Sequence, residues 1–175
     1  YFINSQSSIY GNIGYYSRQP YHDNIYLNYT NQVNPLTENE KIFGMELGYK
    51  YTSNKFSGSV NLYSTSWKDR VVSSSDVEDD VVLFTTNFGV EQLHMGLEID
   101  GTYRVLDNLR LRGFLSVGNW RYKGDAISRV TDEDQNIIEE TVKDVDGGEV
   151  GDAAQTTFGL GADWKITERF SIDAD

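Results

Sequence analysis

Side chains that could act as a nucleophile and its base are sparse in this 175-residue sequence. It holds two histidines, His22 and His94, on different segments, and no cysteine. Covalent catalysis needs a nucleophile within hydrogen-bond reach of a base, and no GxSxG-type elbow occurs. The Gly159-x-Gly161 pair lies inside an alternating segment with no helix after it, so it does not predict a phosphate loop. We therefore expect neither an enzyme nor a bound cofactor.

An Asp-x-Asp-x-Asn motif at 132–136 has the opening spacing of a calcium-binding loop. The glycine required at the sixth position is Ile137 here, and the glutamate required at the twelfth is Lys143. A second motif at 144–147 departs from the pattern in a similar way. A solvated loop is the better interpretation, and we predict no metal site. Divalent ions that bridge to lipopolysaccharide stay open as an alternative.

Binding without catalysis needs side chains that face a wet cavity, and aromatic residues are the best candidates. Aromatic faces stack on sugars and other flat ligands, and they also pack against neighbouring loops. The candidates for lining a substrate path are Tyr63, Trp67, Trp120 and Tyr122. Whether these four side chains share one surface depends on the strands that carry them.

Strict alternation of apolar and polar residues is the strongest signal for those strands. In segment 93–105 the odd positions are apolar or glycine, whereas the even positions are polar, charged or glycine. Period two predicts a half-buried strand, and this segment is long enough for the roughly 9–11 residues that cross a bilayer at a tilt. Further alternating segments lie at 8–18 (less regular), 43–51, 56–63, 109–118, 157–166 and from 170 onward.

Charged residues would share the polar face of these strands. In a small soluble barrel that face would be the packed core, and burying so many charges would cost several kcal/mol for each. In an inside-out barrel the charges line a wet lumen and the apolar face meets lipid. The lumen-facing or plug-facing candidates are Glu46, Lys50, Glu98, Asp100, Arg104, Arg110, Arg112, Asp163 and Lys165.

Short and long connections alternate along the chain. The short ones predict tight hairpin turns at Ser53-Asn54, Asp107-Asn108 and Glu168-Arg169. The long ones are polar stretches that we expect to be loops, at 20–40, 71–92 and 124–152. Many of the Asp and Glu residues lie at 76–80 and at 132–152. Short turns at one end and long loops at the other are typical of outer-membrane barrels.

Aromatic residues occupy the outward positions beside the short turns. Tyrosine and tryptophan suit a membrane interface, although ordinary β-propensity also favours aromatic residues in strands. Alternation, loop asymmetry and aromatics together favour a lipid-interface girdle made of Tyr51, Phe56, Tyr103, Trp164 and Phe170.

Composition agrees with a membrane barrel. The mean hydropathy is −0.51, which is compatible with barrel strands because only every second residue meets lipid. The net charge of −12 and the lack of a basic stripe argue against a nucleic-acid partner. Seven strands, one incomplete, are too few for a closed wall, since bacterial barrels have even strand numbers from eight upward. We therefore expect 1–175 to be part of a single outer-membrane β-barrel domain that continues outside this chain.

Several short motifs resemble the barrels of TonB-dependent receptors, particularly those of the Bacteroidetes type. The resemblance covers most of the chain outside the acidic stretches. Its motifs are YYSRQPYHDNIY at 15–26, Asn-Pro at 34–35, NEKI at 39–42, ELGY at 46–49, NLY at 61–63, WKDR at 67–70 and VGDAAQ at 150–155.

This resemblance implies an all-β transmembrane antiparallel barrel of 22 strands, of which about seven are in this chain. It also implies an N-terminal plug inside the barrel, which Arg110 and Arg112 would meet, and the partner TonB, reached through a region outside this chain. A surface lipoprotein lids some members of the family. We predict energised uptake of a nutrient such as a glycan or a siderophore across the bacterial outer membrane, in contact with lipid and lipopolysaccharide. The alternatives are a structural barrel in an outer-membrane assembly or secretion complex and, more weakly, a passive porin.

Overall fold

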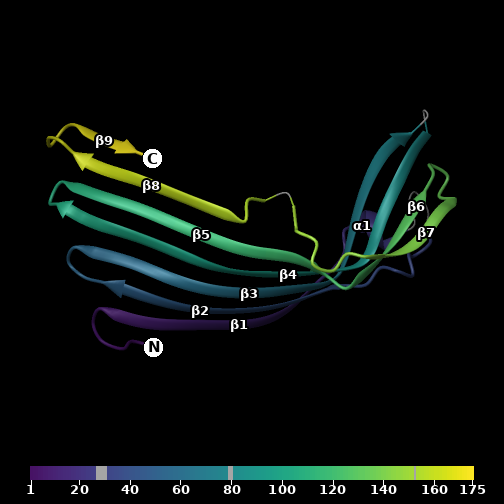
Figure 1. The fold of residues 1–175 in the computed structure, drawn as a ribbon, viewed down its shortest axis with the longest axis horizontal. Coiled ribbons are helices and arrows are strands. Elements are labelled where there is room, and N and C mark those ends of the chain that lie inside the picture. Colours follow the sequence, from purple (N-terminus) through teal and green to yellow (C-terminus); the bar gives the residue numbers. More distant parts are fainter. Residues whose placement is uncertain (27–30, 79–80, 152) are drawn as a thin grey trace.

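The computed structural model describes residues 1–26, 31–78, 81–151 and 153–175, and strands dominate it (Figure 1). Within this part of the chain, no helix is long and apolar enough to cross a membrane. The elements are β1 (Ser7–Arg18), α1 (His22–Ile25), β2 (Glu40–Thr52), β3 (Phe56–Glu78), β4 (Val81–Leu106), β5 (Leu109–Lys123), β6 (Asp125–Thr131), β7 (Ile137–Asp144), β8 (Thr156–Lys165) and β9 (Ser171–Ala174).

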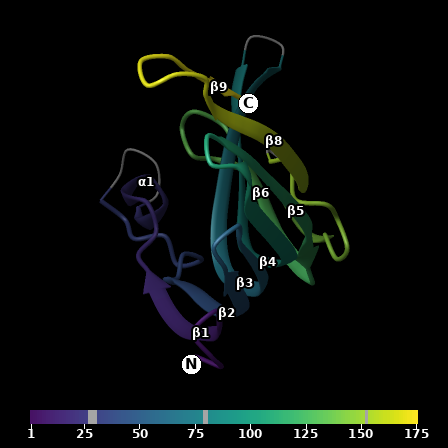
Figure 2. The same cartoon turned by 90° about the vertical axis from the view of Figure 1, so that its left-hand side faces the viewer.

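One antiparallel sheet contains all of these strands. Its main path is β1-β2-β3-β4-β5-β8-β9, so each of these strands pairs with the next along the path, and β6 pairs with the far part of β4 and with β7. The seven strands of the path correspond to the seven alternating segments of the sequence. Figure 2 shows that the sheet is curved like part of a barrel wall, with α1 on its concave side.

The pairing register separates an apolar face from a polar face. Directly opposite residues of antiparallel strands share a face. One row across the sheet therefore joins Leu47, Leu62, Leu97 and Val117. The neighbouring row on the other face includes Glu98. Alternation thus builds two continuous surfaces, as predicted.

Apolar residues on the first face stay exposed, because no second layer covers them. Leu62 is 53% exposed and Leu160 is 79% exposed. The solvent-accessible surface is 12197 Å², whereas a compact protein of 19.9 kDa has about 8,700 Å². Among the residues that are described, the buried apolar side chains are Phe88, Val90 and Ala126. The prediction of an all-β barrel wall is confirmed.

The three predicted hairpin turns lie at one end of the sheet (Figure 1). In the first, the backbone N–H of Ser53 donates to the carbonyl of Phe56 over 2.7 Å. Around these turns, Tyr51 and Phe56 have ring centroids 6.2 Å apart, and Phe56 lies opposite Tyr103. Trp164 lies opposite Ile172 on the same apolar face.

The prediction of plain loops at 71–92 and 124–152 was wrong. β3 and β4 continue beyond the wall as a long hairpin arm, and β6 and β7 form a second hairpin beside it. The acidic residues at 76–80 are typical of a loop, but the region also contains buried apolar side chains, of which Phe88 and Val90 are 2% and 4% exposed. The parts of the predicted loops at 27–30, 79–80 and 152 lie outside the described residues.

Three residues with left-handed backbone conformation mark the boundary between wall and arm. They are Asp69 (φ 58°) on β3, Gly89 (φ 68°) on β4 and Gly124 (φ 64°) between β5 and β6. The β3–β4 register also shifts around Asp69. Glycine adopts this conformation freely, whereas the carboxylate of Asp69 accepts a hydrogen bond of 2.6 Å from Nζ of Lys41. Beyond this line the strands bend away from the direction of the wall (Figure 1).

Candidate functional site

The four aromatic candidates lie on the polar face, away from the short turns. Tyr63 and Trp67 belong to β3, whereas Trp120 and Tyr122 belong to β5, and β4 runs between them. Gln92 of β4 lies directly between Trp67 and Tyr122 in one row. The register of three strands therefore gathers residues that are far apart in sequence.

Trp120 is the best-fixed of these aromatic side chains. Its indole Nε1 donates to the hydroxyl of Tyr63 over 3.0 Å, and its ring stacks on His94 with centroids 5.1 Å apart and planes 14° apart. The ring of Tyr63 lies across Gly96, where an added Cβ would come within 2.4 Å of the tyrosine hydroxyl. A glycine at this position is thus required for the tyrosine to lie flat.

Two arginines lie close to the ring of Trp67. The guanidinium carbons of Arg18 and Arg70 are 5.6 Å and 5.4 Å from its ring centroid, within the range of cation–π attraction. Glu40, which is 5% exposed, holds both cations, with ion-pair distances of 2.8 Å to Arg18 and 4.0 Å to Arg70. The carboxylate therefore holds Arg18 beside the indole, and it lies at the limit of ion-pair distance from Arg70.

Gln92 links the two halves of this arrangement. Its side-chain oxygen accepts a hydrogen bond from Arg70 and lies 3.2 Å from Nε2 of His94, and the residue is 3% exposed. One connected network results, which we call the aromatic–arginine cluster. It consists of Arg18, Glu40, Tyr63, Trp67, Arg70, Gln92, His94 and Trp120, with Tyr122 opposite Gln92.

Sequence reasoning missed the polar members of this cluster. Arg70 stood in the quoted WKDR motif, but nothing in the sequence indicated that Glu40 would neutralise it. The strand register brings these residues together, because it sets Arg18 opposite Glu40 and Ile42 opposite Trp67. The cluster offers flat aromatic faces and fixed cations, so it can hold a flat or hydroxylated solute without reacting with it.

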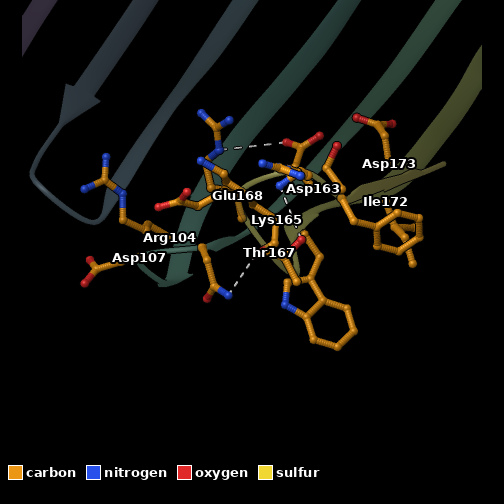
Figure 3. Close-up of a pocket in the computed structure, with 14 residues that line it drawn as sticks. Arg104, Asp107, Asp163, Lys165, Thr167, Glu168, Ile172 and Asp173 are labelled. Carbon is orange, nitrogen blue, oxygen red and sulfur yellow. Dashed lines mark hydrogen bonds and ion pairs between the residues drawn. The ribbon is translucent and has the colours of Figure 1, made fainter.

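The nine charged candidates lie on the same face as Tyr63: Glu46 is directly opposite Tyr63, and the other eight lie nearer the short turns. Arg112 binds three carboxylates, those of Asp173 at 2.7 Å, Asp175 at 2.6 Å and Asp163. A hollow of 720 Å³ adjoins this group, and Figure 3 shows Arg104, Asp163, Lys165 and Asp173 around it. Arg112 is therefore tied to its own wall through three strands.

The motif at 132–136 closes a hairpin turn. One carboxylate oxygen of Asp132 accepts hydrogen bonds from the backbone N–H groups of Asn136 (2.8 Å) and Asp134 (3.0 Å), and the other accepts one from the side chain of Asn136 (2.9 Å). These bonds, that from the Asn136 side chain above all, hold the pKa of Asp132 below its ordinary value. In the described ranges, no three His, Asp or Glu side chains converge to hold a metal ion.

Fold and site together define a segment of a β-barrel wall with one apolar face and one polar face. A family model described as "TonB dependent receptor-like, beta-barrel" matches residues 1–174, and the chain belongs to this family. The predicted resemblance to TonB-dependent receptors is confirmed, whereas the Bacteroidetes-type detail stays a prediction.

A solved structure named "Copper transporter OprC" shares the fold. It has a TM-score of 0.58 and 17% sequence identity, over 97% of this chain and 31% of the transporter's chain. The present chain thus spans about a third of that protein, and at this identity the likeness concerns the fold alone. A comparison with curated proteins gives no match.

Proposed function

We propose that this chain is part of the wall of a TonB-dependent transporter in the bacterial outer membrane, which imports a nutrient by gated passage without chemistry on the solute. The observation that carries the proposal is the aromatic–arginine cluster on the polar face of the wall. Its residues lie toward the end of the wall from which the long arms extend. Family membership supports the same reading.

The two faces of the wall suggest different partners. The apolar face, with the girdle at 51, 56, 103, 164 and 170, contacts lipid and lipopolysaccharide in this proposal. The charged face meets a plug, and TonB acts through a region outside 1–175. We further propose that 1–175 belongs to one barrel domain of 22 strands, and that a surface lipoprotein is an optional partner.

The cluster would act on a solute by positioning it. Glu40 neutralises much of the charge of Arg18 and Arg70, so these cations act chiefly as directional hydrogen-bond donors. Trp67 and Trp120 offer ring faces, each worth about 0.5–1.5 kcal/mol when it stacks on a flat partner. Such a surface retains a solute near the lumen without binding it so tightly that release becomes slow.

Uptake by cells that produce the full-length protein tests this proposal. Depletion from the medium is measured for a maltooligosaccharide, a ferric catecholate, a ferric hydroxamate and cobalamin, with and without a protonophore. We expect one solute class to be depleted only when the membrane is energised. Trp120→Ala should weaken apparent affinity about two- to tenfold, because one stacking contact is lost. Trp164→Ala, on the apolar face near the turns, is the matched control.

Two results would overturn the proposal. Depletion that a protonophore leaves unchanged would identify a passive pore. No depletion of any solute, together with stoichiometric co-purification of assembly-machine subunits, would identify a structural barrel instead.

A further inference from the structure

A second hollow, of 260 Å³, lies among the arms and apart from the aromatic–arginine cluster. Three segments surround it: the stretch that contains α1, the β3–β4 arm and the β6–β7 hairpin. The α1 stretch is fastened in place, since Thr37 Oγ1 donates to the carbonyl of Asn24 over 2.7 Å. Ser73 of the arm contacts the side chain of Asn24 at 3.3 Å. The hollow is thus formed by elements that are held to one another.

Three aromatic residues line this hollow. Phe84 and Phe88 reach it from β4, and Tyr26 reaches it from the stretch after α1. The guanidinium carbon of Arg129 lies 5.6 Å from the ring centroid of Phe88 and is fixed by an ion pair of 2.7 Å with Glu140. The lining of the hollow therefore combines aromatic rings with a cation that an ion pair holds.

Gln135 brings an unsatisfied amide to the same hollow. It occupies the turn between β6 and β7 with a φ of 68°, and its Nε2 is buried without a hydrogen-bond partner among the described residues. Burial of an unpaired amide is unfavourable, so this geometry favours a ligand that completes the bond. Asp23, which also lines the hollow, adds a carboxylate acceptor.

We propose that this hollow binds one pyranose-sized ring of a polyhydroxylated solute. A hydroxyl group both donates and accepts hydrogen bonds, so a polyol suits a mixed set of carboxylate, amide and guanidinium groups. The C–H face of a sugar ring packs on aromatic side chains, as Phe84 and Tyr26 would allow. The volume equals roughly nine water molecules of the liquid, which limits the occupant to a small ring.

This inference rests on the proposed function, because it names the substrate class of the same transporter. It places the first contact with the solute on the external arms rather than in the lumen. A larger glycan would insert one unit in this hollow while the rest extends toward the aromatic–arginine cluster.

Binding to the purified full-length protein in detergent tests the site. The probes are glucose, galactose, maltotriose and cellotriose, with catechol as the aromatic alternative, and affinity is measured by calorimetry and saturation-transfer NMR. Gln135→Gly removes the amide in a residue type that tolerates positive φ, and Phe84→Ala removes part of the aromatic wall. Ile138→Ala is the control, since Ile138 is 58% exposed on β7 and does not line the hollow. Gel mobility before and after heating confirms that every variant barrel is folded.

We expect at least one sugar to bind, with affinity about three- to tenfold weaker in Gln135→Gly, because one hydrogen bond to the ligand is lost. Phe84→Ala should weaken binding similarly, and Ile138→Ala should leave it unchanged. The inference is overturned if no sugar binds at tens of millimolar, if both hollow variants bind as well as the parent, or if catechol alone binds. Sugar binding without energised uptake would refute the transport proposal only, whereas energised uptake of another solute without sugar binding would refute this inference only.

Discussion

Leu62→Arg should destabilise the folded barrel strongly, whereas Ser116→Arg should not. Leu62 is 53% exposed on the apolar face, in a row with Leu47 and Leu97, and it lies midway between the turn end and the arm end of the wall. An arginine that faces lipid near the bilayer midplane costs about 2–4 kcal/mol. The folding equilibrium constant should therefore fall roughly 30- to 700-fold.

Ser116 is a control of nearly equal depth on the opposite face. It lies directly opposite Glu98, so a new guanidinium there meets water and a carboxylate, and we expect a change within about 0.5 kcal/mol. The full-length barrel is refolded from urea into phosphocholine vesicles, and the folded fraction is read from its gel mobility without heating. Equal costs for the two variants, or a larger cost for Ser116→Arg, would refute the assignment of the faces.

Three further predictions follow from individual contacts. Glu40→Gln should loosen the guanidinium groups beside Trp67 and destabilise this end of the wall by about 1.5–3 kcal/mol. The expected result is faster proteolysis of the stretch 19–39. An unchanged cleavage rate would contradict the role of Glu40. Gly96→Ala should displace the ring of Tyr63 and lower the free energy of unfolding by about 1–3 kcal/mol. In a double-mutant cycle, Tyr63→Ala should remove most of that loss. Additive losses would show that the ring does not need the glycine. The pKa of Asp132 is lowered, chiefly by the hydrogen bond from the Asn136 side chain. The ionised carboxylate therefore stabilises the turn at every pH above the ordinary carboxyl pKa. This stabilisation is lost as the pH falls through the lowered pKa. Proteolysis of the β6–β7 hairpin should hence accelerate below about pH 4, less so in Asp132→Asn, and a rate independent of pH would contradict this.

The wall could be predicted from sequence because period two is a local property. The polarity of each residue from 93 to 105 indicates which face of the sheet it occupies. The same alternation places the aromatic residues beside the turns on the apolar face. The arms could not be predicted in this way. Bulges at Asp69 and Gly89 interrupt the period, and the acidic residues at 76–80 interrupt the apolar residues of the stretch 71–92.

The aromatic residues of the candidate site could be predicted from the alternation, but their contacts could not. Tyr63, Trp67 and Trp120 stood out as aromatic residues on the polar face. Their contacts with Arg18 and Glu40 depend on which residues of β1, β2 and β3 lie opposite one another, and a shift of two residues would keep every face and break every contact. The hollow around Gln135 could not be predicted, because its lining comes from three segments that the sequence analysis predicted to be loops.

Site-directed spin labelling along β4 tests the two-faced wall most directly. This chain has no cysteine, so single cysteines at positions 94–101 can be labelled in a full-length background free of other cysteines and reconstituted into vesicles. Collision rates with oxygen, which concentrates in lipid, and with a water-soluble nickel chelate are then compared. The account predicts two period-two profiles out of phase, with oxygen favouring 95, 97 and 99 and the chelate favouring 94, 96, 98 and 100. Profiles in phase, or with the preferences exchanged, would contradict it.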